Sequence, residues 1–252
     1  MKMKFSLGIK YLRQFLVIIG LSLPIDVYGQ TIQLSDESRN HSFSYSILET
    51  ELNNAELIAL IQREILAKPT LSSGVIYAIW IAAEKPVDAP FAGLADNQIG
   101  LMMAWPNSAL SQVDVFNQTL QSLSSVTTVS NRLFEAIYLP AGLEVPSLEG
   151  FYVHREEKYE LADVSDAVRL SKEAWVTWEP HWGVRVIGLF RELGSNADYS
   201  NLNRIVWYPS YSAWLETRNF TEDTESAMRF RERRSMLIPG SGVAIATDRL
   251  LP

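Results

Sequence analysis

Seven polar and aromatic residues in the C-terminal half of this 252-residue sequence could line a pocket for a small ligand. His154 follows Tyr152 at the two-residue spacing of one strand face, whereas Phe151 and Val153 on the other face are apolar. The apolar face suits a covering of helices, so His154 is predicted to point into the interior of the sheet structure. The candidate ligand-binding set is Tyr152, His154, Trp182, Arg185, Arg204, Trp207 and Tyr208.

These residue types support two interpretations. An apolar pocket with a few convergent polar groups could hold a small organic acid or an aromatic compound, or position one for proton abstraction by a histidine. The structural alternative is that tryptophans and tyrosines fill the core while arginines at strand edges reach water. His181, between Pro180 and Trp182, is predicted to be structural and to lie in a loop.

Motifs for common hydrolytic and metal chemistry are absent from the sequence. There are three histidines (His41, His154 and His181), with no HExxH, no histidine pair at metal spacing and no glycine-rich phosphate loop. The stretch GSGVA near the C-terminus does not fit the GxSxG nucleophile elbow. We therefore expect no metal and no resident cofactor; a lone axial histidine leaves haem as the alternative.

The predicted strands and helices that position the candidate residues form an internal repeat, with two copies along the chain. In the first copy, periodicity and turn residues predict strand 43–50, helix 54–66, strands 74–82 and 98–105, helix 108–123 and strand 131–139. In the second copy they predict strand 150–161, a helix from 163 that Pro180 ends, strands 183–190 and 204–208, helical segments within 210–237 and strand 242–250. Both copies have the order β-α-β-β-α-β.

Matching positions support the repeat. Gly74 and Gly183 lie 109 residues apart, and Pro106 and Pro209 lie 103 apart, so the second copy has a hairpin loop six residues shorter. A tryptophan or tyrosine precedes the proline in both copies. The stretch 140–149, with two prolines and a glycine, is the predicted linker between an N-terminal unit (43–139) and a C-terminal unit (150–250).

The repeat predicts an α+β fold of tandem ferredoxin-like βαββαβ units, each a four-stranded antiparallel sheet with helices on one face. The other face of each sheet must meet water or another sheet. Both faces of the strands IYAIWIA, IGLMMAW and VRVIGLF are apolar, which is expected if both faces of the sheet are buried. The two sheets are therefore predicted to pack into a closed or nearly closed barrel with the helices outside.

The C-terminal half also resembles a known family. The stretches WVTWEPHWGVRVIGLFREL and NRIVWYPSYSAWLETRNF, within 175–220, are similar to the NIPSNAP family, in the wider group of dimeric α/β-barrel proteins. The resemblance covers residues 150–250, while the N-terminal half matches in element order. Met228 and Phe230 depart from it, because a tryptophan is expected in that helix. The resemblance implies an intramolecular dimeric α/β barrel.

The N-terminus predicts export. Lys2, Lys4, Lys10 and Arg13 precede an apolar run at 15–25, and Val27-Tyr28-Gly29 offers a cleavage site, so we interpret 1–29 as a signal peptide and 30–42 as a leader. The alternative, an uncleaved anchor, is disfavoured because a bilayer span needs about 20 apolar residues. The expected location is periplasmic or secreted. The sequence has no cysteine, which excludes disulfides and a lipidated cysteine.

The net charge of the chain limits the kinds of binding partner that we expect. The formal net charge is −7, so nucleic acid is not an expected partner. The basic run RFRERR at 229–234 is predicted to form the solvated C-terminal end of a helix that is capped at Asn219 or Thr221. Glu225 is predicted to pair with Arg229 in this helix. The alternative is that the basic run binds an anion. The sequence leaves monomer and homodimer open.

Two functions follow. The first is an exported protein that binds a small organic or hydrophobic ligand in its barrel. The alternative is a cofactor-independent monooxygenase or isomerase-like enzyme, which only the fold analogy with the barrel group supports.

Overall fold

The computed structural model describes residues 40–143, 149–194, 198–219 and 221–251, which all belong to one compact unit, Gln33–Pro252. The predicted signal peptide and all but the last residues of the predicted leader lie outside these ranges, as does the middle of the predicted linker. Those assignments stay predictions.

The first half contains the six elements that the repeat predicts, in the predicted order. They are β1 (His41–Thr50), α2 (Asn54–Ile61), β2 (Val75–Ala82), β4 (Gln98–Pro106), α3 (Ser111–Ser122) and β5 (Val126–Tyr138). Helix α2 begins with a capping box between Asn53 and Glu56 and continues into a π-helical turn, Gln62–Leu66. The loop between β2 and β4 carries a two-residue strand, β3 (Ala92–Gly93), which pairs in parallel with the last strand of the chain.

The second half repeats this order. Its elements are β6 (Phe151–Glu160), α4 (Val164–Trp182), β7 (Arg185–Glu192), β8 (Tyr199–Tyr208), α5 (Tyr211–Glu216), α6 (Thr224–Ser235) and β9 (Val243–Leu251). Strand β8 begins well before the predicted start at residue 204. Its first residues, which include Asn201 and Asn203, are too polar for the apolar pattern that marks its second half.

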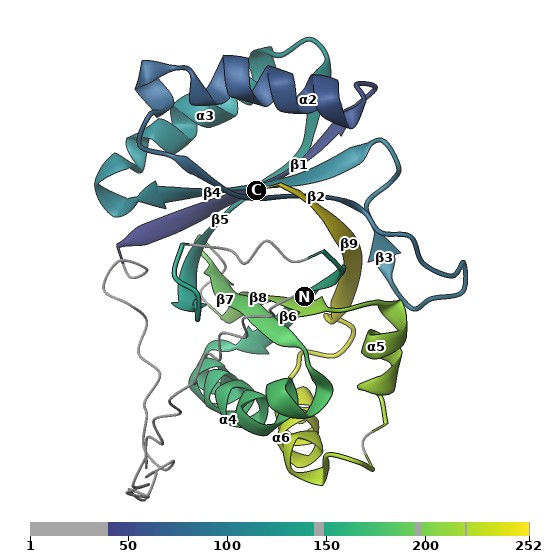
Figure 1. The fold of residues 1–252 in the computed structure, drawn as a ribbon. Coiled ribbons are helices and arrows are strands. Elements are labelled where there is room, and N and C mark those ends of the chain that lie inside the picture. Colours follow the sequence, from purple (N-terminus) through teal and green to yellow (C-terminus); the bar gives the residue numbers. More distant parts are fainter. Residues whose placement is uncertain (1–39, 144–148, 195–197, 220, 252) are drawn as a thin grey trace, which may run out of the picture. The chain divides into compact units, whose positions relative to one another are not determined.

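The strands form two equivalent four-stranded sheets joined into one ring (Figure 1). The strand orders are β2-β4-β1-β5 in the first half and β7-β8-β6-β9 in the second, which correspond position by position. Strand β5 pairs with β7 and strand β2 with β9, both antiparallel, so the eight strands close a barrel. The fold is α+β: two ferredoxin-like units form an intramolecular dimeric α/β barrel. Edge pairing removes the free edges that each sheet would otherwise expose.

The barrel wall separates three apolar clusters. Helices α2 and α3 cover the first sheet and α4 and α6 cover the second (Figure 1), and a core lies beneath each helical layer. The third cluster fills the barrel interior with aromatic side chains, including Phe43, Trp80, Tyr152 and Phe190. Phe151 and Val153 belong to the helix-side core and Tyr152 to the interior, which confirms the predicted alternation along β6.

Two predicted helix boundaries are wrong. Helix α4 runs through Pro180 and ends at Gly183, whose φ of 62° is left-handed. Pro180 lacks the N–H that would donate to the Val176 carbonyl, but the helix continues for two residues beyond it, and Gly183 provides the left-handed conformation at which it ends. His181 therefore lies in the last turn of α4 and not in a loop. Helix α6 is capped by Asp223, whose Oδ1 accepts a hydrogen bond from the Ser226 amide at 3.2 Å.

The described residues contain neither a helix that could span a membrane nor a group of side chains that could hold a metal ion. None of the helices found there combines the length and the apolar character that a bilayer crossing needs. No group of three or more histidine or carboxylate side chains in the same ranges could hold a metal ion.

Candidate functional site

The structure does not bring the seven candidate residues into one pocket, because the second sheet lies between them. Tyr152, His154 and Trp207 are on the barrel-interior face. Arg204 and Tyr208 are on the helix-covered face. Trp182 ends α4, and Arg185 begins β7 as an exposed residue opposite Trp207. The cause is strand alternation, which sends neighbours such as Trp207 and Tyr208 to opposite faces.

His154 is buried in the barrel interior, as its parity predicts. Its ring stacks on Tyr45 with a centroid distance of 5.8 Å and meets the edge of Trp80 at 4.5 Å. The Nε2 atom lies 3.1 Å from the Thr247 hydroxyl. Burial, with a smaller contribution from Arg132, lowers the pKa of His154 to about 3. The imidazole is therefore neutral at physiological pH.

This position does not suit a general base. The interior-facing cavity at the nearby end of the barrel, about 250 Å³, is lined by Arg132, Phe134, Glu156 and Asn203 among others, and His154 is not in its lining. A base must come within hydrogen-bonding distance of the proton that it removes. Nδ1 of His154, the Tyr45 hydroxyl and Nε1 of Trp80 have no hydrogen-bond partner among the described residues. The interior is thus a packed aromatic core with a few unpaired polar atoms.

A second recess lies on the other face of the same sheet, under the helices. It encloses about 40 Å³ between β6, β8, α4 and α6, beside the segment that follows α5. Its apolar wall consists of Val153, Trp175, Trp178, Val206, Tyr208 and Phe230. Its polar wall consists of Arg155, Arg204, Arg218, Arg233 and Arg234. We call this recess the arginine pocket.

Two of the five arginines share one buried carboxylate. Nη2 of Arg204 and Nη2 of Arg233 lie 3.4 and 3.3 Å from the same oxygen, Oε1 of Glu157. The other oxygen of Glu157 accepts a hydrogen bond of 2.8 Å from the Tyr159 hydroxyl. Arg233 also donates to the Ser171 hydroxyl at 3.1 Å. Glu157 therefore compensates only part of the positive charge, and the described lining of the pocket includes no acidic residue.

The remaining cations crowd one another. Burial, and then the neighbouring charge of Arg204, lowers the pKa of Arg155. The pKa of Arg218 is lowered mainly by burial and further by Arg204 and Arg234. Arg218 donates to the Thr217 hydroxyl at 2.8 Å and lies over the Trp214 ring at 5.1 Å. Nε of the buried Arg233 has no hydrogen-bond partner among the described residues. The recess is therefore electropositive in a chain of negative net charge.

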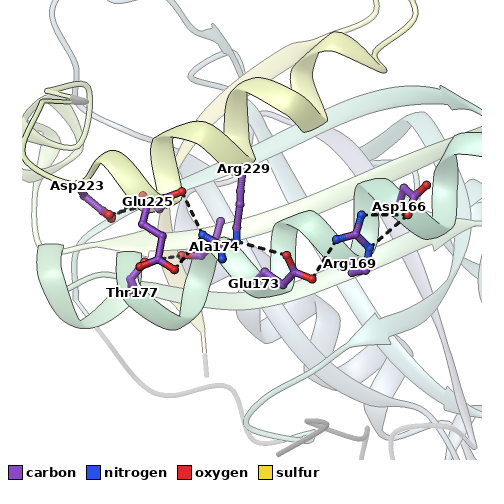
Figure 2. A network of polar contacts seen from close by, with 9 residues as sticks. Asp166, Arg169, Glu173, Ala174, Thr177, Asp223, Glu225 and Arg229 are labelled. Atoms are coloured by element: carbon purple, nitrogen blue, oxygen red, sulfur yellow. Dashed lines mark hydrogen bonds and ion pairs between the residues drawn. The ribbon is translucent and has the colours of Figure 1, made fainter. Parts of the chain in front are cut away.

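A network of exposed ion pairs links α6 to α4 through Arg229 and Glu173 (Figure 2). Glu173 of α4 accepts from Arg169 at 3.0 Å and from Arg229 of α6 at 3.3 Å. Arg229 also pairs with Glu225 at 3.1 Å, which confirms the predicted i,i+4 pair. The basic run at 229–234 is nevertheless not wholly a solvated face, because Arg233 points inward and is 4% exposed.

Comparison with known proteins shows the fold. No protein-family model and no curated protein matches the sequence. The structure of an anthrone oxidase-like protein is similar, with a TM-score of 0.58 at 13% identity, over 85% of this chain and 93% of that one. Chlorite dismutase from Candidatus Nitrospira defluvii gives a TM-score of 0.50 at 11% identity, over 83% and 91%. Both are dimeric α/β-barrel proteins with ferredoxin-like units, as this chain is in fold.

Sequence reasoning missed most of the arginine pocket. Of its polar wall, only Arg204 was a candidate, and Arg233 and Arg234 appeared only within a basic run. A signal was available in β6, where Arg155 and Glu157 occupy the parity of Val153 and Tyr159. Charged residues on an otherwise apolar, helix-covered strand face must be paired or functional, because burying a charge is costly.

Proposed function

We propose that this protein binds a small organic ligand in the arginine pocket of its second half. The observation that carries the proposal is the combination of aromatic and arginine walls in one partly open recess. Ligand sites are typically concave and mostly apolar, with a few polar groups that fix orientation. The enclosed 40 Å³ suits a small compound or the head of a larger one, with the exposed Arg234 at the opening.

A cofactor-independent monooxygenase or isomerase-like enzyme is the second candidate. The fold of the anthrone oxidase-like protein favours it, although fold alone does not specify chemistry. An enzyme of this kind needs a group that takes up a proton. The pocket offers arginines, which stay protonated, and Tyr208, whose pKa is raised by burial. Binding therefore accounts for these side chains better than proton abstraction does.

Haem does not fit the arginine pocket. Its described lining contains no histidine or methionine that could ligate the iron, and its enclosed volume is far below the roughly 300 Å³ at which pockets for drug-sized ligands begin. His154 is on the opposite face of the sheet, with Nε2 engaged by Thr247.

Membership of the NIPSNAP family and export are further parts of the proposal. The resemblance of residues 175–220 supports the first, and the basic and apolar pattern of residues 1–29 supports the second. Expression of the full chain in its natural host, followed by N-terminal sequencing of the protein outside the cytoplasm, tests export. A mature chain that begins at Gln30 supports cleavage, and a full-length chain that stays in the cytoplasm contradicts it.

Native mass spectrometry of protein purified from its natural host tests ligand binding. The wild type should carry added mass that denaturation releases as a small organic compound. Trp178→Leu removes an aromatic wall and should abolish the added mass. Trp105→Leu is the matched control, since Trp105 is equally buried between sheet and helices in the first half. Loss of the ligand from both variants, or from neither, would contradict this location.

A further inference from the structure

We infer that the ligand presents an oxyanion, a phosphate or carboxylate group, to the guanidinium groups of Arg155, Arg218 and Arg233. This inference rests on the proposed function and specifies the ligand class of the same pocket. It starts from an imbalance of charge in the lining: Arg204 and Arg233 share the single carboxylate of Glu157, and Arg155, which lines the same pocket, pairs with no carboxylate in the described ranges.

An excess of buried and half-buried cations is unfavourable without an anion. Arg155 makes no ion pair in the part of the chain that the structure describes, and the largest charge effect on it is the like charge of Arg204, which the carboxylate of Glu157 opposes more weakly. Desolvated like charges repel strongly, and proteins retain buried charges where they are paired or bind a ligand. The chain has a net charge of −7, so a local cluster of this kind is not a consequence of general basicity.

The geometry suits an oxyanion. The three arginines come from β6, from the segment that follows α5 and from α6, so their side chains approach the recess from the sheet and from the helical layer. Guanidinium groups donate in a planar fork that matches phosphate and carboxylate oxygens. A space of 40 Å³ is larger than a single water needs, at about 10–15 Å³, and suits a group of a few heavy atoms. Trp175 and Trp178 are placed to cover the organic remainder of the ligand.

The test measures thermal stability and binding with defined anions. Wild-type protein is dialysed into buffer free of oxyanions and titrated with inorganic phosphate, citrate or benzoate, with sodium chloride at matched ionic strength. Isothermal titration calorimetry gives the Kd. We expect a saturable rise in Tm with at least one oxyanion and none with chloride. A response to phosphate alone assigns a phosphate group, and a response to citrate or benzoate alone assigns a carboxylate.

The decisive variant is Arg155→Gln, with Arg169→Gln as the control of equal charge change on the outer face of α4 (Figure 2). Removal of one crowded cation should leave the Tm of Arg155→Gln without oxyanion equal to or above that of wild type. Its Kd for the oxyanion should be weaker by about 10- to 100-fold, the worth of a charge-assisted hydrogen bond. Arg169→Gln should bind as wild type does.

Two results would overturn the inference. One is the absence of a saturable response to any of the three anions in wild type. The other is an Arg155→Gln variant that binds as wild type does or that loses stability in oxyanion-free buffer. An uncharged compound released in native mass spectrometry, without any oxyanion response, would overturn the anion class while the proposed binding function stands. Because Arg155 is half-buried and makes no ion pair in the described ranges, Arg155→Gln is expected to fold.

Discussion

Replacement of Glu157 by glutamine removes the carboxylate shared by two buried arginines. The Glu157 side chain is 6% exposed, and its partners Arg204 and Arg233 are 9% and 5% exposed. Removal of one partner from a buried ion pair leaves an uncompensated charge and costs about 3–5 kcal/mol. For a domain of this size, each kcal/mol lowers Tm by about 2–4 °C. We therefore expect Glu157→Gln to lower Tm by about 6–20 °C in oxyanion-free buffer.

The matched control is Glu173→Gln, which also removes a carboxylate that two arginines share. Glu173 is 42% exposed, and exposed pairs contribute about 0–1 kcal/mol. Its Tm should fall by no more than about 4 °C. Thermal and urea unfolding followed by circular dichroism measure both effects. If Glu157→Gln melted within the range of the control, the claim of a buried, undercompensated arginine cluster would be wrong.

Three further predictions concern the barrel and the helical layer. The pKa of His154 is about 3 in the folded state and 6.5 in the unfolded state. The unfolded state therefore binds the proton first as the pH falls below 6.5, and the free energy of unfolding decreases by roughly 4–5 kcal/mol toward pH 3. His154→Leu should flatten this dependence in urea melts, and an unchanged slope would refute the assignment. A Cβ on Gly100 would lie 2.5 Å from the Tyr45 hydroxyl, so Gly100→Ala should cost about 1–3 kcal/mol, whereas Gly242→Ala, with open space around it, should change the free energy of unfolding little. Asp223→Ala removes the cap of α6 and should cost about 1 kcal/mol by urea unfolding; an unchanged free energy of unfolding would contradict a stabilising role of this cap.

The fold was predictable because two local patterns agree. The β-α-β-β-α-β order occurs twice, and strands such as β2 and β4 are apolar on both faces, which requires cover on both sides. Closure of the ring was less predictable. The pairing of β5 with β7 and of β2 with β9 depends on which edges meet, and the hydrophobic pattern of a strand does not encode its neighbour.

The site was predictable only in part. Alternation placed His154 in the interior, but the same alternation separates Trp207 from Tyr208 and divides the predicted set between two faces. The arginine pocket depends on Arg155, Arg218 and Arg233, which come from β6, from the segment after α5 and from α6, and which meet only where the helical layer packs on the second sheet. Pro180 misled the prediction for a different reason, since a proline in the last helical turn removes one hydrogen bond without ending the helix.

A crystal structure of the protein grown with the oxyanion that binds most tightly tests the central claim most directly. The account predicts density for the anion between β6, β8, α4 and α6, within hydrogen-bonding distance of Arg155 and Arg233. Density in the barrel interior beside His154, or an arginine pocket filled only by water at saturating anion, would contradict it.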